Sequence, residues 1–273
     1  MNRLRRGAGL AELVVALALS TVLAAMAAAA LVAVERYVRR TSADDAARRV
    51  LREAEFVLLS EVRGAAADSV AVRGDTAIDL LAGVALSVTC SAAGRDIVLP
   101  SDVSVSGFPF TVLRSAPAAG DVLAAYDTVA GWRTTRIEVV QWRSNGVGCP
   151  TASGFRSPAD SAARLRVLRL RLAVPVAAAG APVRIFRRGR YVLARGGDGT
   201  WGLAWRRCDA PPAPCGSAQP VAGPLASAAD GGLEVGLDPG RGTLSVRLAA
   251  PRAPDPPRSS ALTIALRLGD ARP

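Results

Sequence analysis

Glu12 is the residue whose chemistry most needs explaining, because it stands at the edge of a long apolar run. The segment from Leu13 to Val34 contains no charged residue. At about 22 residues it would measure about 33 Å as a helix, which is enough to cross a bilayer. An unpaired carboxylate at such a position costs on the order of 3 kcal/mol. We therefore expect Glu12 to have a positively charged partner.

A short basic leader precedes this run and ends in glycine. Arg3, Arg5 and Arg6 come before Gly7, and Glu12 follows that glycine five positions later. An ordinary secretory signal has an apolar core of roughly 7–15 residues. The run here is longer, carries a glutamate at its start and continues without a clear break into more predicted helix. These features are not typical of an ordinary secretory signal.

The order of these elements resembles the prepilin-type signal of type IV pilins and type II secretion pseudopilins. In that family a membrane peptidase cuts after the glycine, the new amino terminus is methylated, and the fifth mature residue is a glutamate. The resemblance places the cut between Gly7 and Ala8, makes Ala8 the methylated residue and gives Glu12 the fifth position. It covers residues 1–35 and departs from the family at Ala8, where a bulky residue is usual, and at Gly9 and Ala11.

The resemblance also implies a partner for the carboxylate. The new amino group on Ala8 stays positive, and in side-by-side helices the amine of one subunit would pair with Glu12 of its neighbour. The implied partners are other pilins or pseudopilins, the prepilin peptidase and methyltransferase, and inner-membrane lipid. The alternative is that Glu12 lies at the headgroup boundary, exposed to water.

Four cysteines are the next residues with chemistry of their own: Cys90, Cys149, Cys208 and Cys215. An even number behind an export-type signal predicts an oxidising compartment and up to two disulfides. Of the three pairings we favour Cys208 with Cys215, because the proline-rich stretch between them is a stiff loop that a short bridge would close. Cys90 and Cys149 are the remaining candidates, and free buried thiols are the alternative.

All 34 basic residues are arginine, and the formal net charge is +11. Four of them alternate with apolar residues along one predicted strand: Arg164, Arg166, Arg169 and Arg171. With arginines between 184 and 195, and with Tyr191, Trp201 and Trp205 as stacking surfaces, they would form a face for an anionic partner such as DNA. The alternative, which we prefer, is the ordinary solvent-facing side of a sheet in a chain of biased composition.

The absence of histidine removes the commonest general base and metal ligand. A serine–histidine triad is excluded, and a zinc site would need all four cysteines. The segment Gly196-Gly197-Asp198-Gly199 precedes a predicted strand instead of a helix, so we interpret it as a turn and not as a phosphate-binding loop. We predict no enzymatic activity, no metal and no cofactor.

Downstream of the apolar run the sequence predicts more helix, from Glu35 to about Arg63, with Gly64 as a stop signal. Apolar residues recur there at helical spacing, which predicts a stripe lying on a sheet. The stripe consists of Ala47, Val50, Leu51, Ala54, Val57, Leu58 and Val62.

From Val70 onward, short apolar segments separated by Gly, Pro, Asp and Ser predict β-strands. The expected strands are Val70–Arg73, Thr76–Leu81, Ala85–Cys90, Ile97–Leu99, Phe108–Leu113, Val122–Tyr126, Arg136–Trp142, Ala163–Val174, Val183–Arg195, Thr200–Trp205, Leu233–Leu237, Thr243–Leu248 and Leu262–Leu268. A slip in the alternation at Val167-Leu168 is interpreted as a bulge, and the segment at 196–199 as the turn of a hairpin.

The expected fold class is α+β, with a long N-terminal helix, transmembrane in its first half, packed on a mainly antiparallel β-sheet head. The expected divisions are a leader at 1–7, a transmembrane and assembly helix at 8–34, a periplasmic extension at 35–64 and a head at 65–273, with sub-sheets at about 65–160 and 161–273. The length and strand order resemble the larger minor members of the family, the J-type pseudopilin and the W-type pilin.

The expected function is that of a minor pilin or pseudopilin, which joins or initiates a type IV pilus or a type II secretion pseudopilus. We expect a single-pass protein of the bacterial inner membrane with its head in the periplasm. One alternative is a DNA-binding or adhesive module on such an anchor. The other is an ordinary secreted β-protein whose signal is cut near Ala27–Ala30.

Overall fold

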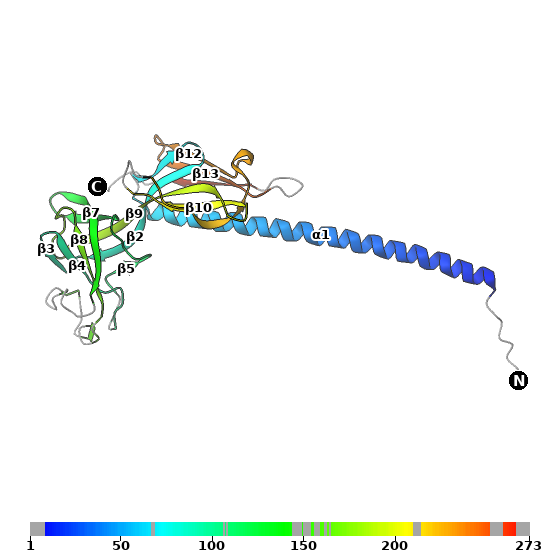
Figure 1. The fold of residues 1–273 in the computed structure, drawn as a ribbon, viewed down its shortest axis with the longest axis horizontal. Helices are drawn as coiled ribbons and strands as arrows, with labels where there is room; N and C mark the ends of the chain where they lie inside the picture. The colour runs from blue at the N-terminus through cyan, green and yellow to red at the C-terminus, as the bar shows by residue number, and fades with distance from the viewer. Residues whose placement is uncertain are drawn as a thin grey trace.

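The computed structural model describes residues 9–66, 69–105, 107, 109–143, 149, 154–155, 159–160, 163, 165–209, 214–251 and 259–265. One long N-terminal helix, α1, carries a β-rich head on its C-terminal part (Figure 1). The paired strands of the described head are antiparallel. The predicted α+β class is therefore confirmed.

Helix α1 runs without a break from Leu10 to Gly64, a length of 55 residues, or about 80 Å. Its sequence is rich in alanine, leucine and arginine, which favour helix, and contains no proline. The C-terminal part packs on the head through the predicted stripe. Leu51, Ala54, Leu58 and Val62 are buried, and Ala47, Val50 and Val57 are partly buried beside them. The stripe and the end at Gly64 match the prediction.

The described strands of the head range from two to fourteen residues in length. They are β1 (Ala71–Arg73), β2 (Ala77–Val88), β3 (Ser91–Ala93), β4 (Asp96–Leu99), β5 (Val112–Leu113), β6 (Val122–Asp127), β7 (Gly131–Arg143), β8 (Val167–Leu172), β9 (Pro182–Arg195), β10 (Trp201–Arg207), β11 (Gln219–Leu225), β12 (Leu233–Asp238), β13 (Thr243–Ala249) and β14 (Ser259–Ala265). A 3-10 turn, η3, spans Ala228–Asp230.

The strands form two sheets. The larger has the order β1-β2-β9-β6-β7-β8-β4-β3, with β10 on β9, β11 on β10 and β5 on β2; the smaller has the order β12-β13-β14. Strand β9 from the second half of the chain lies between β2 and β6 from the first half. The strand pairing thus differs from the expected division near residue 160, because two long apolar strands from different halves pair along almost their whole length.

Strands β2 and β9 run through both lobes of the head (Figure 1). The first half of β2 and the second half of β9 contribute to one core, and the opposite halves contribute to another. Their register shifts between Gly83 and Ala85, which is a bulge of the kind that bends a strand. A Cβ at Gly83 would lie 2.9 Å from the carbonyl oxygen of Gly64. Glycine therefore fits where the end of α1 meets this bend.

The lobe next to the helix has a core shared by α1 and both sheets. It is built mainly from aliphatic side chains: Leu51, Leu58, Ile78, Leu80, Leu193, Leu203, Leu225, Leu233, Leu244, Val246, Leu248 and Ile264 are buried in it. Tyr191 lies in the same core with Trp205 packed at a ring distance of 4.8 Å. A Cβ at Gly189 would lie 1.8 Å from the Trp205 ring, so this glycine makes room for the indole.

The distal lobe, farther from the start of α1, closes on itself like a small barrel. Only two residues separate the end of β2 from the start of β3. Since β2 is second and β3 is last in the strand order, the far end of the sheet lies close to β2. The enclosed core takes side chains from β2, β4, β6, β7, β8 and β9, among them Ile97, Leu99, Leu123, Ile137, Leu168, Leu170, Leu172, Val183 and Ile185.

A buried carboxylate ties the two lobes together. Asp121, just before β6, accepts hydrogen bonds from Nε and Nη2 of Arg187 at 2.9 and 2.8 Å and from the backbone N–H of Ala118 at 2.8 Å. Arg207 of β10 lies 3.6 Å from the same carboxylate. Breaking such a buried pair by removing one partner typically costs about 3–5 kcal/mol. Glu61 of α1 also pairs with Arg114 after β5, at 3.0 Å.

Several strand predictions differ from the structure in informative ways. The segments expected at 76–81 and 85–90 are one bent strand, β2, and β11 was not expected because Pro220 and Pro224 obscure its pattern. The bulge expected at Val167-Leu168 is instead the start of β8, and the register shift lies on β7 between Ile137 and Val139. The β9–β10 hairpin is confirmed.

We expect Leu58→Ala to lower the free energy of unfolding by about 3 kcal/mol, because it removes a fully buried side chain and leaves a cavity. Phe56→Ala is the matched control, since Phe56 lies on the same turn but is 72% exposed; we expect its effect to stay within about 0.5 kcal/mol. Denaturant unfolding of the full chain in detergent, followed by tryptophan fluorescence, measures both. Equal effects would contradict the packing described.

Candidate functional site

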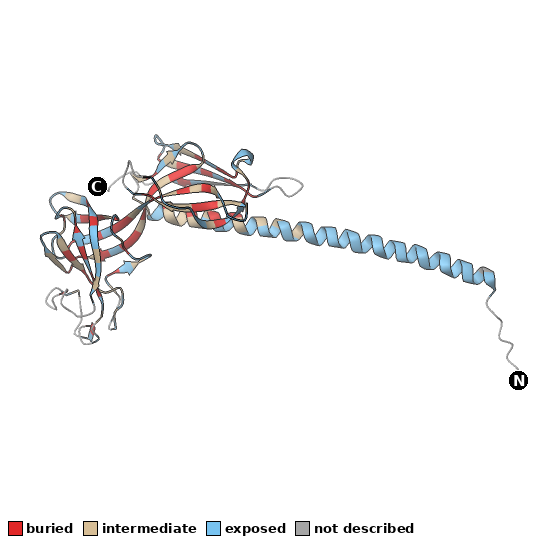
Figure 2. Ribbon diagram, viewed as in Figure 1, coloured by how far each residue is buried: buried red, intermediate tan, exposed pale blue. Residues whose placement is uncertain are grey.

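The first part of α1 exposes apolar side chains to its surroundings. Every described side chain from residue 12 to residue 40 is exposed, and Figure 2 shows this stretch as a continuous pale blue rod. The large apolar side chains here include Leu13, Val14, Leu17, Leu19, Leu23, Met26 and Leu31, with exposed fractions of 58% or more. This helix is long and apolar enough to cross a membrane. Water is an unfavourable environment for such a surface.

Glu12 lies in the first turn of α1. The backbone N–H of Gly9 donates a hydrogen bond to Oε2 of Glu12 at 3.3 Å, so the carboxylate caps its own helix. A carboxylate is also favoured there by the positive end of the helix dipole. The side chain is exposed, which leaves it open to a donor from another molecule. Gly7 and Ala8, the expected cleavage and methylation residues, lie outside the described residues.

The arginines expected on one face of β8 differ in their surroundings. Arg169 and Arg171 of β8 share Asp96 of β4, at 3.1 and 3.4 Å. Arg166 lies at the start of this segment and stacks on Trp142, 5.1 Å from the ring centre, while Arg164 is outside the described residues. Desolvation raises the pKa of Asp96, but hydrogen bonds and charge from Arg169 and Arg171 outweigh it, so the pKa lies below its ordinary value. Part of the positive charge on β8 is therefore neutralised.

The arginines and aromatic rings of β9 and β10 are also used inside the fold. Arg187 pairs with buried Asp121, and Arg190 makes a two-point contact with Asp79 at 2.6 and 3.0 Å. Tyr191 is buried against Trp205, and desolvation raises the pKa of its hydroxyl. These rings are thus not the open stacking surface that the sequence indicated. No contact described for the chain brings these arginines onto one binding surface.

The cysteines pair as two disulfides. Cys208 and Cys215 are bridged with Cα atoms 4.0 Å apart, as favoured from the sequence, and Cys90 is bridged to Cys149 with Cα atoms 5.1 Å apart. The second bridge attaches the long connection between β7 and β8 to the end of β2. Val167 packs directly against it. Both bridges are in the head, where an oxidising compartment would keep them formed.

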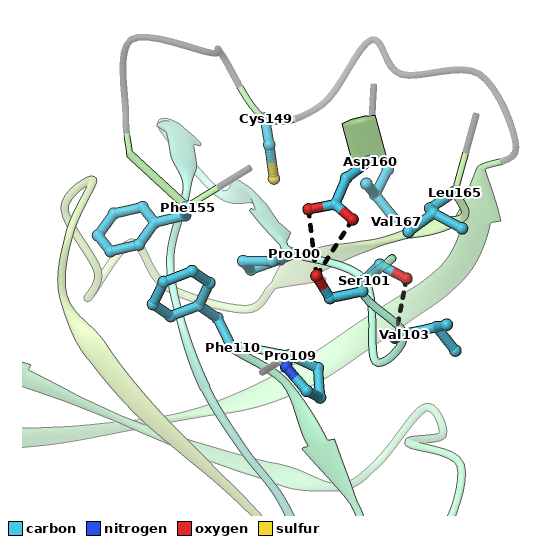
Figure 3. Close-up of a pocket in the computed structure, with 11 residues that line it drawn as sticks. Pro100, Ser101, Val103, Pro109, Phe110, Cys149, Phe155, Asp160, Leu165 and Val167 are labelled. Carbon is cyan, nitrogen blue, oxygen red and sulfur yellow. Dashed lines mark hydrogen bonds between the residues drawn. The ribbon is translucent and has the colours of Figure 1, made fainter. Parts of the chain in front are cut away.

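A small cavity of about 30 Å³ lies beside Cys149 at the end of the barrel (Figure 3). The buried carboxylate of Asp160 accepts hydrogen bonds from the Ser104 hydroxyl at 3.1 Å and the Val105 N–H at 2.8 Å. Phe110 and Phe155 pack edge to face on its other side, with ring centres 5.4 Å apart. These contacts hold two loops together, and the space is too small for a substrate.

Exposed apolar side chains gather on the same loops and were not anticipated from the sequence. Val103, Val105 and Phe110 are 56%, 58% and 48% exposed, and the cross-strand pair Val112 and Leu86 are 55% and 52% exposed. Strand predictions place such residues in the core by default, because alternation alone cannot show which face a neighbouring strand leaves open. This end of the head can contact other proteins, but it contains no catalytic arrangement among its described residues.

A wider groove of about 600 Å³ lies beside the β9–β10 turn. Its walls include Glu53 of α1, the turn at 196–200 and residues of β10 and β11 such as Trp201 and Val221. Asp198 is occupied within the turn, since it accepts hydrogen bonds from the N–H and hydroxyl of Thr200 at 3.0 and 2.8 Å. Within the described part of the chain, no group of three or more Cys, Asp or Glu residues could hold a metal ion.

Comparisons with known proteins find no family model, no curated protein and no solved structure that matches this chain. Function must therefore be inferred from the residues and geometry of the chain itself. Among them, the exposed apolar helix is the feature that most clearly requires a partner.

The two disulfides should differ in their contribution to stability. The Cys90–Cys149 bridge spans 59 residues and the Cys208–Cys215 bridge spans 7; the chain-entropy relation then gives about 4 and about 2 kcal/mol. We expect replacement of the first pair by serine to lower the free energy of unfolding by about 2 kcal/mol more than replacement of the second. Denaturant unfolding of the full chain in detergent measures this difference. An equal or reversed order would contradict it.

Proposed function

We propose that this chain is a pilin-like assembly subunit, a minor pilin or type II secretion pseudopilin, that joins or initiates a filament of like helices. The main support for this proposal is that α1 is one continuous helix whose first part is exposed and whose last part is packed in the head. It exposes apolar side chains before residue 40 and buries a stripe between Leu51 and Val62 in the head. A single Leu or Val side chain left in water loses the burial free energy of about 1.5–3 kcal/mol that it would gain in an apolar environment. Lipid, and then neighbouring helices, would cover this surface.

The spacing of Gly7, Ala8 and Glu12 supports the proposal independently of the helix. A cut after Gly7 would create an amine on Ala8, and the amine of one subunit would pair with Glu12 of the next. Glu12 is exposed in the first turn of α1, where a neighbouring helix could reach it. In a medium of low dielectric constant, leaving either charge alone is costly. The pair would therefore fix the axial register between helices.

The same arrangement gives the location. The helix would cross the bacterial inner membrane once, with the basic leader on the cytoplasmic side and the head in the periplasm. Two disulfides in the head are consistent with an oxidising compartment. The large, strand-rich head is consistent with the J-type pseudopilin and the W-type pilin, the larger minor members of the family. The chain acts as a substrate of the prepilin peptidase and methyltransferase, and catalyses no reaction in this proposal.

The DNA-binding alternative has less support. Asp96 takes up the charge of Arg169 and Arg171, and Tyr191 with Trp205 lies in the core of the helix-proximal lobe. An ordinary secretory signal is also less well supported, because a cut near Ala27–Ala30 would still leave exposed apolar residues such as Leu31, Val34 and Val38 at the new terminus.

We expect Glu12→Ala to insert into membranes normally and to lose helix–helix association by about tenfold or more, because removing one partner leaves the other charge unpaired in low dielectric, which costs about 3 kcal/mol. A photo-crosslinking residue at Ala16, exposed one turn along the helix, reports association in cells that carry the filament machinery. Glu35→Ala is the control, since Glu35 is an exposed glutamate at the opposite end of the apolar run. Unchanged adducts with Glu12→Ala, or an equal loss with Glu35→Ala, would overturn the pairing.

A further inference from the structure

A group of basic and aromatic side chains lies on one side of α1 just after its apolar run. Arg36, Tyr37, Arg39 and Arg40, here called the arginine collar, follow Val34 within six positions. All four side chains are exposed, and Tyr37 is 69% exposed. At 100° per residue these side chains fall within an arc of about 160°, so they share one side of the helix. The collar is thus an exposed patch of guanidinium groups with a tyrosine at its edge.

The charge of this segment is unbalanced. Glu35 is the only acidic residue within it and pairs with Arg39. No ion pair is formed by Arg36 or Arg40 with any described residue of the chain. The next stretch of the helix is nearly balanced by comparison: it carries Arg48, Arg49 and Arg52 beside Asp44, Asp45, Glu53 and Glu55. The arginines and the acidic residues of α1 are equal in number, so the positive charge at the collar is a local excess and not a property of the whole helix.

The position of the collar matches a bilayer surface. Glu12 and Arg36 are separated by about 36 Å of helix, and the hydrocarbon core of a bilayer is about 30 Å thick. When Glu12 lies at one boundary, the collar lies among the headgroups of the other leaflet. Tyrosine is enriched at both membrane–water interfaces. An arginine near the end of a membrane helix keeps its aliphatic stem in apolar surroundings while its guanidinium reaches the phosphate.

The head leaves this surface uncovered. The first buried residue of α1 is Leu51, which is about 16 Å along the helix beyond Arg40. The described side chains of α1 are exposed from residue 12 through residue 40, and partial burial begins at Thr41; Figure 2 shows this as the change from pale blue to tan toward the head. Lipid headgroups can therefore approach the collar without displacing any part of the head.

We propose that the arginine collar binds the phosphates of anionic phospholipids in the leaflet that faces the head. Guanidinium groups contact phosphate oxygens through two parallel hydrogen bonds, which favours arginine over a simple point charge at such a site. The adjoining apolar run holds the collar at a bilayer surface, so lipid is the occupant instead of a soluble polyanion. The contact fixes the depth of the subunit in the membrane. The inference uses the proposed function only in assuming that α1 resides in a bilayer.

Native mass spectrometry of the full chain in detergent tests the proposal, with phosphatidylglycerol and phosphatidylcholine added in equal amounts. The wild-type chain should retain phosphatidylglycerol preferentially. Replacing Arg36, Arg39 and Arg40 by glutamine should reduce that preference by on the order of a hundredfold, since each arginine near an anionic surface contributes about fivefold. The matched control replaces Arg48, Arg49 and Arg52 by glutamine, which removes the same charge beyond the bilayer surface; it should retain the wild-type preference.

Two results would overturn the proposal. The first is an unchanged lipid preference in the collar variant. The second is an equal loss in both variants, which would show that overall charge matters and position does not. Circular dichroism of each variant confirms that α1 and the head remain folded. The result is separate from the pilin assignment, because a wrong mature N-terminus would overturn that assignment without changing lipid selection.

Discussion

The structure depends on one physical constraint: the first part of α1 carries an apolar surface that no described part of the chain covers. From residue 12 to residue 40 every described side chain is exposed, yet the helix is unbroken to Gly64. The hydrophobic effect requires that lipid or other helices cover this surface. Glu12 at one end and the arginine collar at the other then bracket the stretch that can lie in hydrocarbon. In the proposed function, membrane residence and assembly would be two uses of the same exposed stretch of helix.

The head is built to hold the other end of that helix firmly. Leu51, Ala54, Leu58 and Val62 lie in a core that includes strands from both sheets. Strands β2 and β9 then carry this core into the distal barrel, and Asp121 with Arg187 and Arg207 fixes the junction. The C-terminal part of α1 and the two lobes are therefore joined by continuous packing and strand pairing. The exposed apolar side chains around Phe110 lie on the distal lobe, on loops whose described residues do not pack on α1.

Much of the helix, but less of the head, could be predicted from sequence. The 3.6-residue period between Ala47 and Val62 is strong, and so are the apolar run and the Gly7–Glu12 spacing, because each is a local pattern. Partners of charged residues are not local: Asp96 and Asp121 are far in sequence from the arginines that they pair with. The pairing of β2 with β9 could not be predicted for the same reason, because these strands are far apart in sequence. Strand β11 was missed because its two prolines interrupt the strand pattern. The arginine face on β8 was an interpretation of one strand without its neighbours.

The mass of the mature N-terminus tests the account most directly. The chain would be expressed in cells that contain a prepilin peptidase, extracted from the inner membrane and digested for mass spectrometry of its first peptide. The account predicts a peptide that begins at Ala8 and carries a methyl group on its amine, with Glu12 as its fifth residue. A chain that keeps Met1 to Gly7 when the peptidase is active, or one that begins near Ala27–Ala30, would contradict it.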